Sequence, residues 1–345
     1  MSEKQPFVTI VMPIRNEADY IGRTIRSILD NDYPADRLEI LVADGQSDDG
    51  TAEIVNGVAK KDPRVKLFEN TGRIVSTALN MMLRAARGDI FIPVSGHCVV
   101  TSGFIRKSVA CLTGHPEAWV AGGYLKTVSV GFIGRVVAAA TQSRVGVGDA
   151  RHRLGNFDGW VDTVAFGAHY LWVLDKVGYF DEELVRNQDD EFNMRIIQAG
   201  GKIRISSNIC STYYSRSSLK KLWRQYFQYG FWRTRTLQKH GKPAVFRQVI
   251  PVIFVVTIIS LALLGLVSPL FWWVLASLLL IYSLALVSGA IDVGRQTGWK
   301  CALAAPLIFK IIHFGYGLGT LWGFVRFIIL RGAGMKKPDR MKLSR

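Results

Sequence analysis

Apolar residues follow two alternating spacings along the first hundred positions. Residues 7–13 form a short, nearly continuous apolar run, which is typical of a buried strand. Ile21, Ile25, Ile28 and Leu29 follow at offsets 0, 4, 7 and 8, the spacing of an amphipathic helix. The alternation continues with predicted strands at 38–43, 65–68 and 90–94 and predicted helices at 51–60 and 76–86. Such a βαβ series predicts an α/β unit with a Rossmann-like, mostly parallel sheet.

Polar clusters follow three of these predicted strands. They are residues 15–17 (RNE), 44–47 (DGQS) and 95–97 (SGH). Ligands of parallel α/β sheets bind at the carboxyl ends of the strands, so we expect a site here. Residues 104–214 should add further strands and helices, which gives one domain over residues 1–218.

A long uncharged segment lies in the C-terminal third. Residues 248–291, 44 positions, contain no charged residue and no His. At about 1.5 Å per residue, this length allows two helices that each cross a hydrocarbon core of about 30 Å, and Ser268-Pro269 supplies a turn. We therefore predict two transmembrane helices in this segment.

The flanking segments are both apolar and basic. Residues 219–247 place aromatic and aliphatic residues on one helical face and bases elsewhere, which predicts an amphipathic helix region in the membrane interface. Residues 301–330 are apolar but carry Lys310, His313 and Arg326, together with Pro306 and several glycines. We predict a re-entrant hairpin or interfacial helices there, followed by a basic cytoplasmic tail at 331–345.

The net charge of +16, from 43 Lys and Arg against 27 Asp and Glu, is concentrated beside these segments. Residues 219–247 hold eight bases and no acid, and residues 331–345 hold six bases and one acid. Charge packed against membrane segments favours contact with anionic lipids and argues against a nucleic-acid binder. The positive-inside rule, with no secretory signal at residues 1–10, predicts a cytoplasmic catalytic domain at the plasma membrane.

Two other classes of protein are excluded by composition. A hydrophobic content of 49% is too high for a disordered chain. The four cysteines show no C-x-x-C spacing, so a zinc site, a redox pair or a disulfide scaffold is not indicated.

Several motifs in order resemble glycosyltransferase family 2, whose members have the GT-A fold. The nucleotide-binding half is matched by VTIVMPIRNEADYIGRTIRSIL, EILVADGQSDDGTAEIV and TALNMMLRAARGD. The acceptor half is matched by the segment from VDTVAFGAHY to QDDEFNMRIIQAGGKI, and HFGYGLGTLWG is similar to the membrane region of the succinoglycan-biosynthesis ExoA-like branch. The resemblance covers about residues 6–240 and implies a GT-A domain followed by C-terminal interfacial and transmembrane helices.

The resemblance implies that the strand-end loops hold a nucleotide sugar. The candidate nucleotide-binding residues are Pro13, Asn16, Glu17, Asp44 and Asn80. A carboxylate can accept a hydrogen bond from N3 of uracil, which fits Asp44, with Glu17 near the ribose hydroxyls. The alternative for Asp44-Gly45 is an ordinary turn.

Ser95-Gly96-His97 stands where the family usually has Asp-x-Asp or Asp-x-His, which binds a divalent cation at the donor diphosphate. A Ser95 hydroxyl is a poorer ligand for Mg²⁺ or Mn²⁺ than a carboxylate. His97 is therefore a candidate either for a metal ligand or for a direct phosphate contact.

The acidic run at 188–191 (QDDE) resembles the family motif that carries the catalytic base. Inversion at an anomeric carbon needs one carboxylate to deprotonate the acceptor hydroxyl, and Asp189 is our candidate. Asp190 and Glu191 are candidate acceptor or rim residues. The alternative is a solvated acidic start of a helix, since acids favour helix N-termini.

Four residues of the basic aromatic segment are candidates for an acceptor site or its rim: Arg224, Gln225, Trp232 and Arg233. A Trp ring can stack on a sugar, and an Arg guanidinium can bind phosphate with two hydrogen bonds. Membrane anchoring by the same residues is the alternative.

These features predict an inverting hexosyltransferase with a nucleotide-sugar donor, a UDP-sugar for preference. Its acceptor would be a polyprenyl-diphosphate-linked saccharide in exopolysaccharide or cell-surface glycan assembly. Two alternatives stay open: transfer to a polyprenyl monophosphate, and a catalytically weak nucleotide-sugar-binding membrane protein.

Overall fold

The chain folds into two compact units in a computed structural model that describes residues 5–215, 218–241 and 246–330. Unit 1 comprises residues 1–126 and 155–214, and unit 2 comprises residues 127–154 and 215–344. The predicted basic tail at 331–345 lies outside the described residues. Each unit contains its own buried apolar core.

Unit 1 is built on one mixed sheet with the strand order β3-β2-β1-β4-β8-β6-β9-β5, with β7 on β9. The strands are β1 (Val8–Ile14), β2 (Leu38–Asp44), β3 (Val65–Glu69), β4 (Ile90–Pro93), β5 (Cys98–Val100), β6 (Ala118–Val128), β7 (Gly159–Val161), β8 (Ala165–Tyr170) and β9 (Lys202–Tyr214). The predicted βαβ series is confirmed, since β1 pairs in parallel with both β2 and β4, and β2 pairs in parallel with β3. Beyond β4 the pairings of β8 with β4 and with β6 are antiparallel, as are those of β5 and β7 with β9.

Helices cover both faces of this sheet because its strands alternate their side chains between two apolar layers. The unit contains α1 (Ile21–Leu29), the short 3₁₀ turn η1 (Ala35–Arg37), α2 (Thr51–Ala59), α3 (Val75–Ala85), α4 (Phe104–Thr113), α8 (Val173–Val177) and α9 (Gln188–Gln198). Ile10 and Met12 of β1 pack in the same layer as α1 and α4, whereas Val11 packs in the layer of α3 and α9. The two layers therefore fix which helices flank the carboxyl ends of β1–β4.

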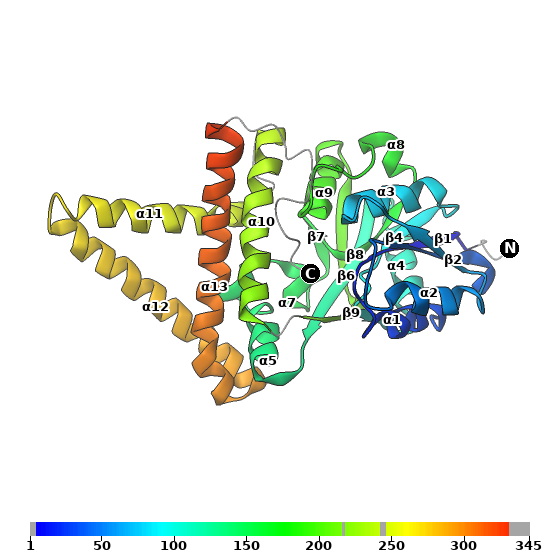
Figure 1. Ribbon diagram of the computed structural model, residues 1–345, viewed down its shortest axis with the longest axis horizontal. Coiled ribbons are helices and arrows are strands. Elements are labelled where there is room, and N and C mark those ends of the chain that lie inside the picture. The colour runs from blue at the N-terminus through cyan, green and yellow to red at the C-terminus, as the bar shows by residue number, and fades with distance from the viewer. Residues whose placement is uncertain (1–4, 216–217, 242–245, 331–345) are drawn as a thin grey trace. The chain divides into compact units, whose positions relative to one another are not determined.

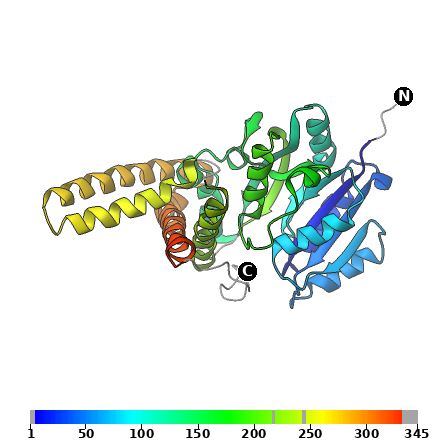
Figure 2. The same cartoon turned by 90° about the horizontal axis from the view of Figure 1, so that it is seen from above.

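Apart from the end of β6 at residues 127–128, the regular elements in the described part of unit 2 are helices. Its elements are α5 (Gly131–Ala140), α6 (Arg144–Val147), α7 (Arg151–Leu154), α10 (Leu219–His240), η2 (Phe246–Gln248), α11 (Ile250–Leu264), α12 (Leu270–Thr297), α13 (Trp299–Phe324) and the π-helical turn η3 (Val325–Ile329). Figures 1 and 2 show α10 and α13 side by side, while α11 and α12 form a hairpin that runs across the direction of that pair.

Glycines allow α10 and α13 to approach closely. A Cβ on Gly230 of α10 would lie 2.0 Å from the carbonyl oxygen of Tyr316. A Cβ on Gly319 of α13 would lie 2.1 Å from the carbonyl oxygen of Phe227, and one on Gly323 would lie 2.7 Å from that of Phe231. The glycines therefore serve helix packing rather than chain reversal.

This packing corrects the prediction of a re-entrant hairpin at 301–330. Residues 299–324 form one continuous helix that contains Pro306, so the hairpin is wrong, and an interfacial helix stays a prediction. The uncharged segment at 248–291 does divide at Ser268-Pro269 into α11 and α12, but α11 has only 15 residues. By length and composition, α12 and the run Trp299–Ile329 could each cross a membrane.

Gly319→Ala should destabilise unit 2, because its Cβ would meet backbone that cannot rotate away. We expect a loss of about 2 kcal/mol, typical of overpacking, which is seen as a lower thermal unfolding midpoint of the detergent-solubilised protein. Gly315→Ala on the same helix is the matched control, since its Cβ would find its nearest neighbour at 3.4 Å. Alanine favours helices, so the control should be neutral or stabilising. Equal midpoints for the two variants would contradict this account.

Candidate active site

The loops after four parallel strands meet at one edge of the unit 1 sheet. In the register, Ile14 at the end of β1 lies beside Asp44 at the end of β2, and Asp44 lies beside Glu69 at the end of β3. Val11 of β1 lies beside Pro93 at the end of β4. The parallel pairing therefore brings the predicted polar clusters together.

Asn16 joins the loop after β1 to the loop after β2. Its side-chain nitrogen donates to Asp48 Oδ1 at 2.8 Å, and its side-chain oxygen accepts from Asp48 N at 3.1 Å. Its backbone N–H donates to Ser47 Oγ at 2.8 Å. Asn16 adopts a left-handed φ of 54°, a conformation that Asn tolerates better than most residues. The residue thus shapes the edge, and its contact with a nucleotide stays a prediction.

Asp44 stabilises a turn at residues 44–47, as the alternative interpretation of Asp44-Gly45 predicted. Its carboxylate accepts from the backbone N–H of Ser47 at 3.0 Å and from Ser47 Oγ at 2.5 Å. Each carboxylate oxygen has a second lone pair, so a turn role and acceptance from a base N–H are compatible. Asp44 is buried, and Pro13, which lies beside Ala43 in the register of β1 with β2, is half-buried.

Asp49 in the same loop is held ionised by its neighbours. Burial by itself raises the pKa of this carboxyl, but hydrogen bonds from the Thr51 hydroxyl and the backbone N–H groups of Ala18 and Thr51 outweigh it, so the pKa lies below its usual value. This charge ties the start of α2 to the loop after β1. The edge therefore consists of loops that are hydrogen-bonded to one another.

Glu17 and His97 form a buried pair that sequence reasoning did not foresee. His97 Nδ1 lies 3.1 Å from Glu17 Oε1, and the two residues are 6% and 4% exposed. The Tyr213 ring meets the imidazole edge-on, with 4.6 Å between the ring centroids. Eighty residues separate the partners in the chain, so only the closeness of the β1 and β4 ends reveals the contact. Their roles at the donor stay predictions, and the contact means that the two side chains would act as a pair.

The residues around Ser95 do not by themselves fit a protein-held divalent cation. Among the described residues there is no group of three or more His, Cys, Asp or Glu side chains that could hold a metal. One ring nitrogen of His97 already contacts Glu17, and Ser95 offers only a hydroxyl. Mg²⁺ and Mn²⁺ prefer carboxylate and phosphate oxygens, so the donor diphosphate would have to supply most of the ligands.

Gln46 and Arg73 occupy the same edge; Gln46 belongs to the predicted polar cluster 44–47 without an assigned role, and Arg73 was missed in the sequence. Arg73 Nε donates to Gln46 Oε1 at 2.5 Å, and Gln46 Nε2 donates to Glu69 Oε1 at 3.3 Å. Both have left-handed φ values, 58° for Arg73 and 60° for Gln46. Left-handed backbone at non-glycine residues concentrates at functional sites. Arg73 lies outside every quoted motif, so the sequence offered no signal for it.

Asn80 is placed differently from its prediction as a nucleotide ligand. It is buried on α3, where its side-chain nitrogen donates to the Phe180 carbonyl and to Glu182 Oε1, both at 2.8 Å. Its side-chain oxygen accepts from the Phe180 N–H at 2.9 Å. Both amide hydrogens and the amide oxygen are thus used on the 180–182 loop. These bonds give Asn80 a role in holding that loop, and a nucleotide contact stays a prediction that only the second lone pair of the amide oxygen could serve.

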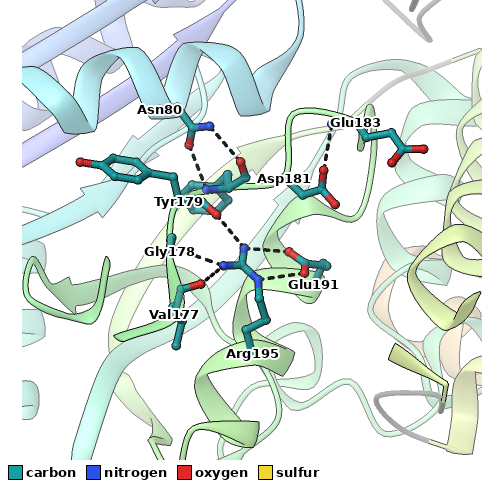
Figure 3. A network of polar contacts seen from close by, with 9 residues as sticks. Asn80, Val177, Gly178, Tyr179, Asp181, Glu183, Glu191 and Arg195 are labelled. Atoms are coloured by element: carbon teal, nitrogen blue, oxygen red, sulfur yellow. Dashed lines mark hydrogen bonds and ion pairs between the residues drawn. The ribbon is translucent and has the colours of Figure 1, made fainter. Parts of the chain in front are cut away.

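The acidic run forms the first turn of α9, as the helix-start interpretation also predicted. Asn187 precedes the helix in a left-handed conformation, with a φ of 62°. Asp189 is exposed and Asp190 is half-buried, whereas Glu191 is buried and forms an ion pair with Arg195. Figure 3 shows the Arg195 guanidinium between Glu191 and the carbonyl groups of residues 177–179. Glu191 therefore faces an arginine inside the fold, which contradicts its prediction as a rim residue.

Four predicted residues belong to α10 of unit 2. Trp232 and Arg233 are buried, at 2% and 8% exposure, and the Trp232 ring packs against Phe231 and Phe327. The prediction that Trp232 stacks on a sugar at a rim is therefore wrong, because its ring faces belong to the helix packing. Arg224 and Gln225 are half-buried, and Gln225 donates to the Tyr229 hydroxyl at 2.8 Å.

Comparisons with known proteins agree with this architecture. The profile of glycosyl transferase family 2 matches residues 9–152. The succinoglycan biosynthesis protein ExoA of Rhizobium meliloti is 32% identical over 249 residues, which cover 70% of this chain and 73% of that protein. A second relative, from Methanococcus voltae, is 25% identical over 93% of this chain and 98% of its own length. It is named as a dolichyl N-acetyl-α-D-glucosaminyl phosphate 3-β-D-2,3-diacetamido-2,3-dideoxy-β-D-glucuronosyltransferase.

A solved structure shares the fold over most of the chain. The mannosyltransferase PcManGT from Pyrobaculum calidifontis, determined with GDP-mannose and Mn²⁺, superposes with a TM-score of 0.57 at 20% identity. The match covers 92% of this chain and 88% of that protein. With a mixed sheet that gathers polar loops at one edge, a matching profile and a 32% identical relative, this chain belongs to glycosyl transferase family 2.

Proposed function

We propose that this glycosyltransferase is an inverting enzyme that moves a sugar from a UDP-sugar to a saccharide linked to a polyprenyl diphosphate at the cytoplasmic face of a membrane. The product would enter exopolysaccharide or cell-surface glycan assembly. The observation that carries the proposal is the exposed Asp189 carboxylate on α9. The loop before α9 is hydrogen-bonded to the start of α3, beside the sheet edge at the carboxyl ends of β1–β4, which we call the donor edge.

The donor edge supports a nucleotide sugar. Asp44 provides a buried carboxylate with lone pairs that remain for a base N–H, which suits uracil. Arg73 follows the end of β3 and His97 follows the end of β4, with β2 and β1 between these strands, and both side chains are of types that suit a diphosphate. No step of the proposed reaction is assigned to a metal ion.

Asp189 suits the role of general base. Leu184, four residues before α9, accepts a hydrogen bond through its carbonyl from Ser76 Oγ at 2.9 Å, and Ser76 lies in the first turn of α3. Since α3 begins after the carboxyl end of β3, the start of α9 belongs to the donor edge. There Asp189 would take the proton of the acceptor hydroxyl. The hydroxyl oxygen bonds to C1 of the donor sugar as the C1–O bond to the diphosphate breaks, and this displacement inverts C1.

The acceptor is inferred from the relatives and from unit 2. The Methanococcus voltae protein is named for a sugar acceptor carried on dolichyl phosphate, and the Rhizobium meliloti protein for succinoglycan biosynthesis. A lipid-linked acceptor lies in a membrane, which suits an enzyme that carries membrane helices. Helix α12 is long and apolar enough to cross a membrane, and most of its length is exposed in unit 2.

The arrangement of unit 2 favours the interface for α10 and α13. α10 carries six Lys or Arg residues and no acid, which is too much charge for the hydrocarbon core. α13 packs along α10 through Gly319 and Gly323 and therefore lies beside it. The α11–α12 hairpin runs across this pair, so it enters the bilayer while α10 and α13 lie along the anionic lipid surface.

A donor screen in membranes tests the function. UDP-sugars and GDP-mannose are incubated with polyprenyl-diphosphate-linked saccharide, with polyprenyl monophosphate, or without acceptor, each with and without chelator. We expect UDP release that depends on the lipid-linked saccharide. Release with polyprenyl monophosphate alone would identify the other transferase, and binding without release in every arm would contradict catalysis.

Asp189→Asn should lower kcat about a hundredfold or more while KM for the donor changes little, because an amide cannot accept the acceptor proton. The measurement is initial-rate kinetics on purified protein in detergent or nanodiscs. Asp175→Asn, an exposed carboxylate on α8, is the matched control and should turn over like the wild type. Normal turnover by the Asp189 variant would remove it from this role.

The hairpin orientation can be tested with introduced cysteines. Ser268→Cys, at the turn between α11 and α12, should react with a membrane-impermeant maleimide only from the side opposite the catalytic domain. Thr297→Cys, at the end of α12, should react only from the side of the catalytic domain. Labelling is scored as a gel shift beyond that of the native cysteines. Reaction of both positions from the same side would overturn a spanning hairpin.

A further inference from the structure

The loop that leads into α9 is held by an arginine of that same helix. Arg195 Nη2 donates to the Tyr179 carbonyl at 2.8 Å, and Arg195 Nη1 donates to the carbonyls of Val177 and, at 3.4 Å, Gly178. Val177 is the last residue of α8, so these bonds fix the exit of that helix. Figure 3 shows one guanidinium reaching all of them.

Glu191 fixes the direction of this guanidinium. Its two carboxylate oxygens accept from Arg195 Nε at 2.8 Å and from Nη2 at 2.9 Å. The side chains of Glu191 and Arg195 are 3% and 20% exposed. The pair is therefore bidentate and largely desolvated, unlike an ordinary ion pair on a helix surface.

The same loop is held from the other side by α3. Asn80 makes three hydrogen bonds to residues 180 and 182, and Ser76 donates to the Leu184 carbonyl. Residues 177–184 are therefore hydrogen-bonded to two helices. One is α3, which starts at the donor edge, and the other is α9, which carries Asp189. We call residues 177–184 the clamped loop.

Only three residues, 185–187, separate the clamped loop from α9. Asn187 is buried with a left-handed φ, and its carbonyl accepts from the Glu191 N–H at 3.0 Å. Such a short and bonded connection transmits a shift of the loop to the first helical turn. A displacement of about 1 Å is enough to reduce a rate substantially where reacting groups must be aligned.

We propose that Arg195, oriented by Glu191, is a positioning residue for glycosyl transfer: it holds the clamped loop so that the first turn of α9 presents Asp189 to the acceptor hydroxyl. Asn80 and Ser76 complete the clamp from α3. This inference rests on the proposed function, because it assigns a role in the reaction of Asp189.

Arg195→Lys is the decisive variant. Lysine keeps a positive charge beside Glu191, but it cannot donate to Glu191 and to the carbonyls of residues 177 and 179 at once. We expect kcat to fall about tenfold or more, with KM for the donor within about twofold of the wild type and a small change in the unfolding midpoint. Lys176→Met, which removes an exposed cation of α8, is the matched control and should leave kcat unchanged.

A second pair of measurements separates positioning from stability. Ser76→Ala removes one bond to the clamped loop, and its effect on kcat should be non-additive with that of Arg195→Lys, because both act on the same segment. Hydrogen exchange on the donor-free protein should quicken at residues 177–184 and 188–191 in Arg195→Lys and not in Lys176→Met. Unchanged kcat, or a fall in kcat matched by a rise in donor KM, would overturn the positioning role.

The failure of the proposed function would look different. If the wild type releases no nucleoside diphosphate with any donor and acceptor, the transferase proposal fails and the role of Arg195 in catalysis fails with it. If the wild type turns over but hydrogen exchange at 188–191 is unaffected by Arg195→Lys, the proposed function stands and the clamp is wrong.

Discussion

The parallel pairing of β1 with β2 and β4 is the constraint on which the site depends. Parallel strands place their carboxyl ends at one edge, and the loops after β1, β2, β3 and β4 therefore meet there. Their backbones are then held by contacts between loops, such as the two hydrogen bonds between Asn16 and Asp48. Left-handed backbone at Asn16, Gln46 and Arg73 shows that the edge has a fixed and partly strained shape. A donor would meet a surface that is already formed.

The half of unit 1 beyond β4, where we propose that the acceptor binds, is organised differently. Its strands pair antiparallel, and α9 follows a loop instead of a strand end. At the donor edge the parallel pairing of the strands brings the loops together, whereas here side chains have to hold the loop before α9 in place. Arg195, Glu191, Asn80 and Ser76 do so by binding the backbone of residues 177–184 from two helices. The bonds from Asn80 and Ser76 are buried and costly to lose, whereas those from Arg195 are part-buried or exposed and contribute less to stability.

Unit 2 shows how one helix pair can combine charge with apolar packing. α10 is rich in bases, yet its Phe231, Trp232 and Thr234 are buried. The backbone carbonyls of Phe227 and Phe231 lie close to glycines of α13, where any larger residue would force the helices apart. The glycines of residues 315–323, which suggested a break in the chain, are instead where the helices meet.

Hydrophobic period and motif order are local properties of the chain, so the βαβ series and the gathering of polar loops, Asp44 among them, at one edge of the sheet could be predicted from the sequence, as could the helix that begins with the acidic run at Asp189. The sequence by itself also determined the uncharged segment and the basic segments beside it. The contact of Glu17 with His97 and that of Arg73 with Gln46 were decided only by the tertiary structure, because they join residues that are 80 and 27 positions apart. Glu191 and Arg195 stand four apart, the spacing of a helical ion pair, but their use as a clamp depends on where the 177–179 carbonyls lie. Trp232 and Asn80 show the same limit. Trp and Asn both suit ligand binding, but here Trp232 packs between helices and Asn80 binds the backbone of Phe180, which only the tertiary structure reveals.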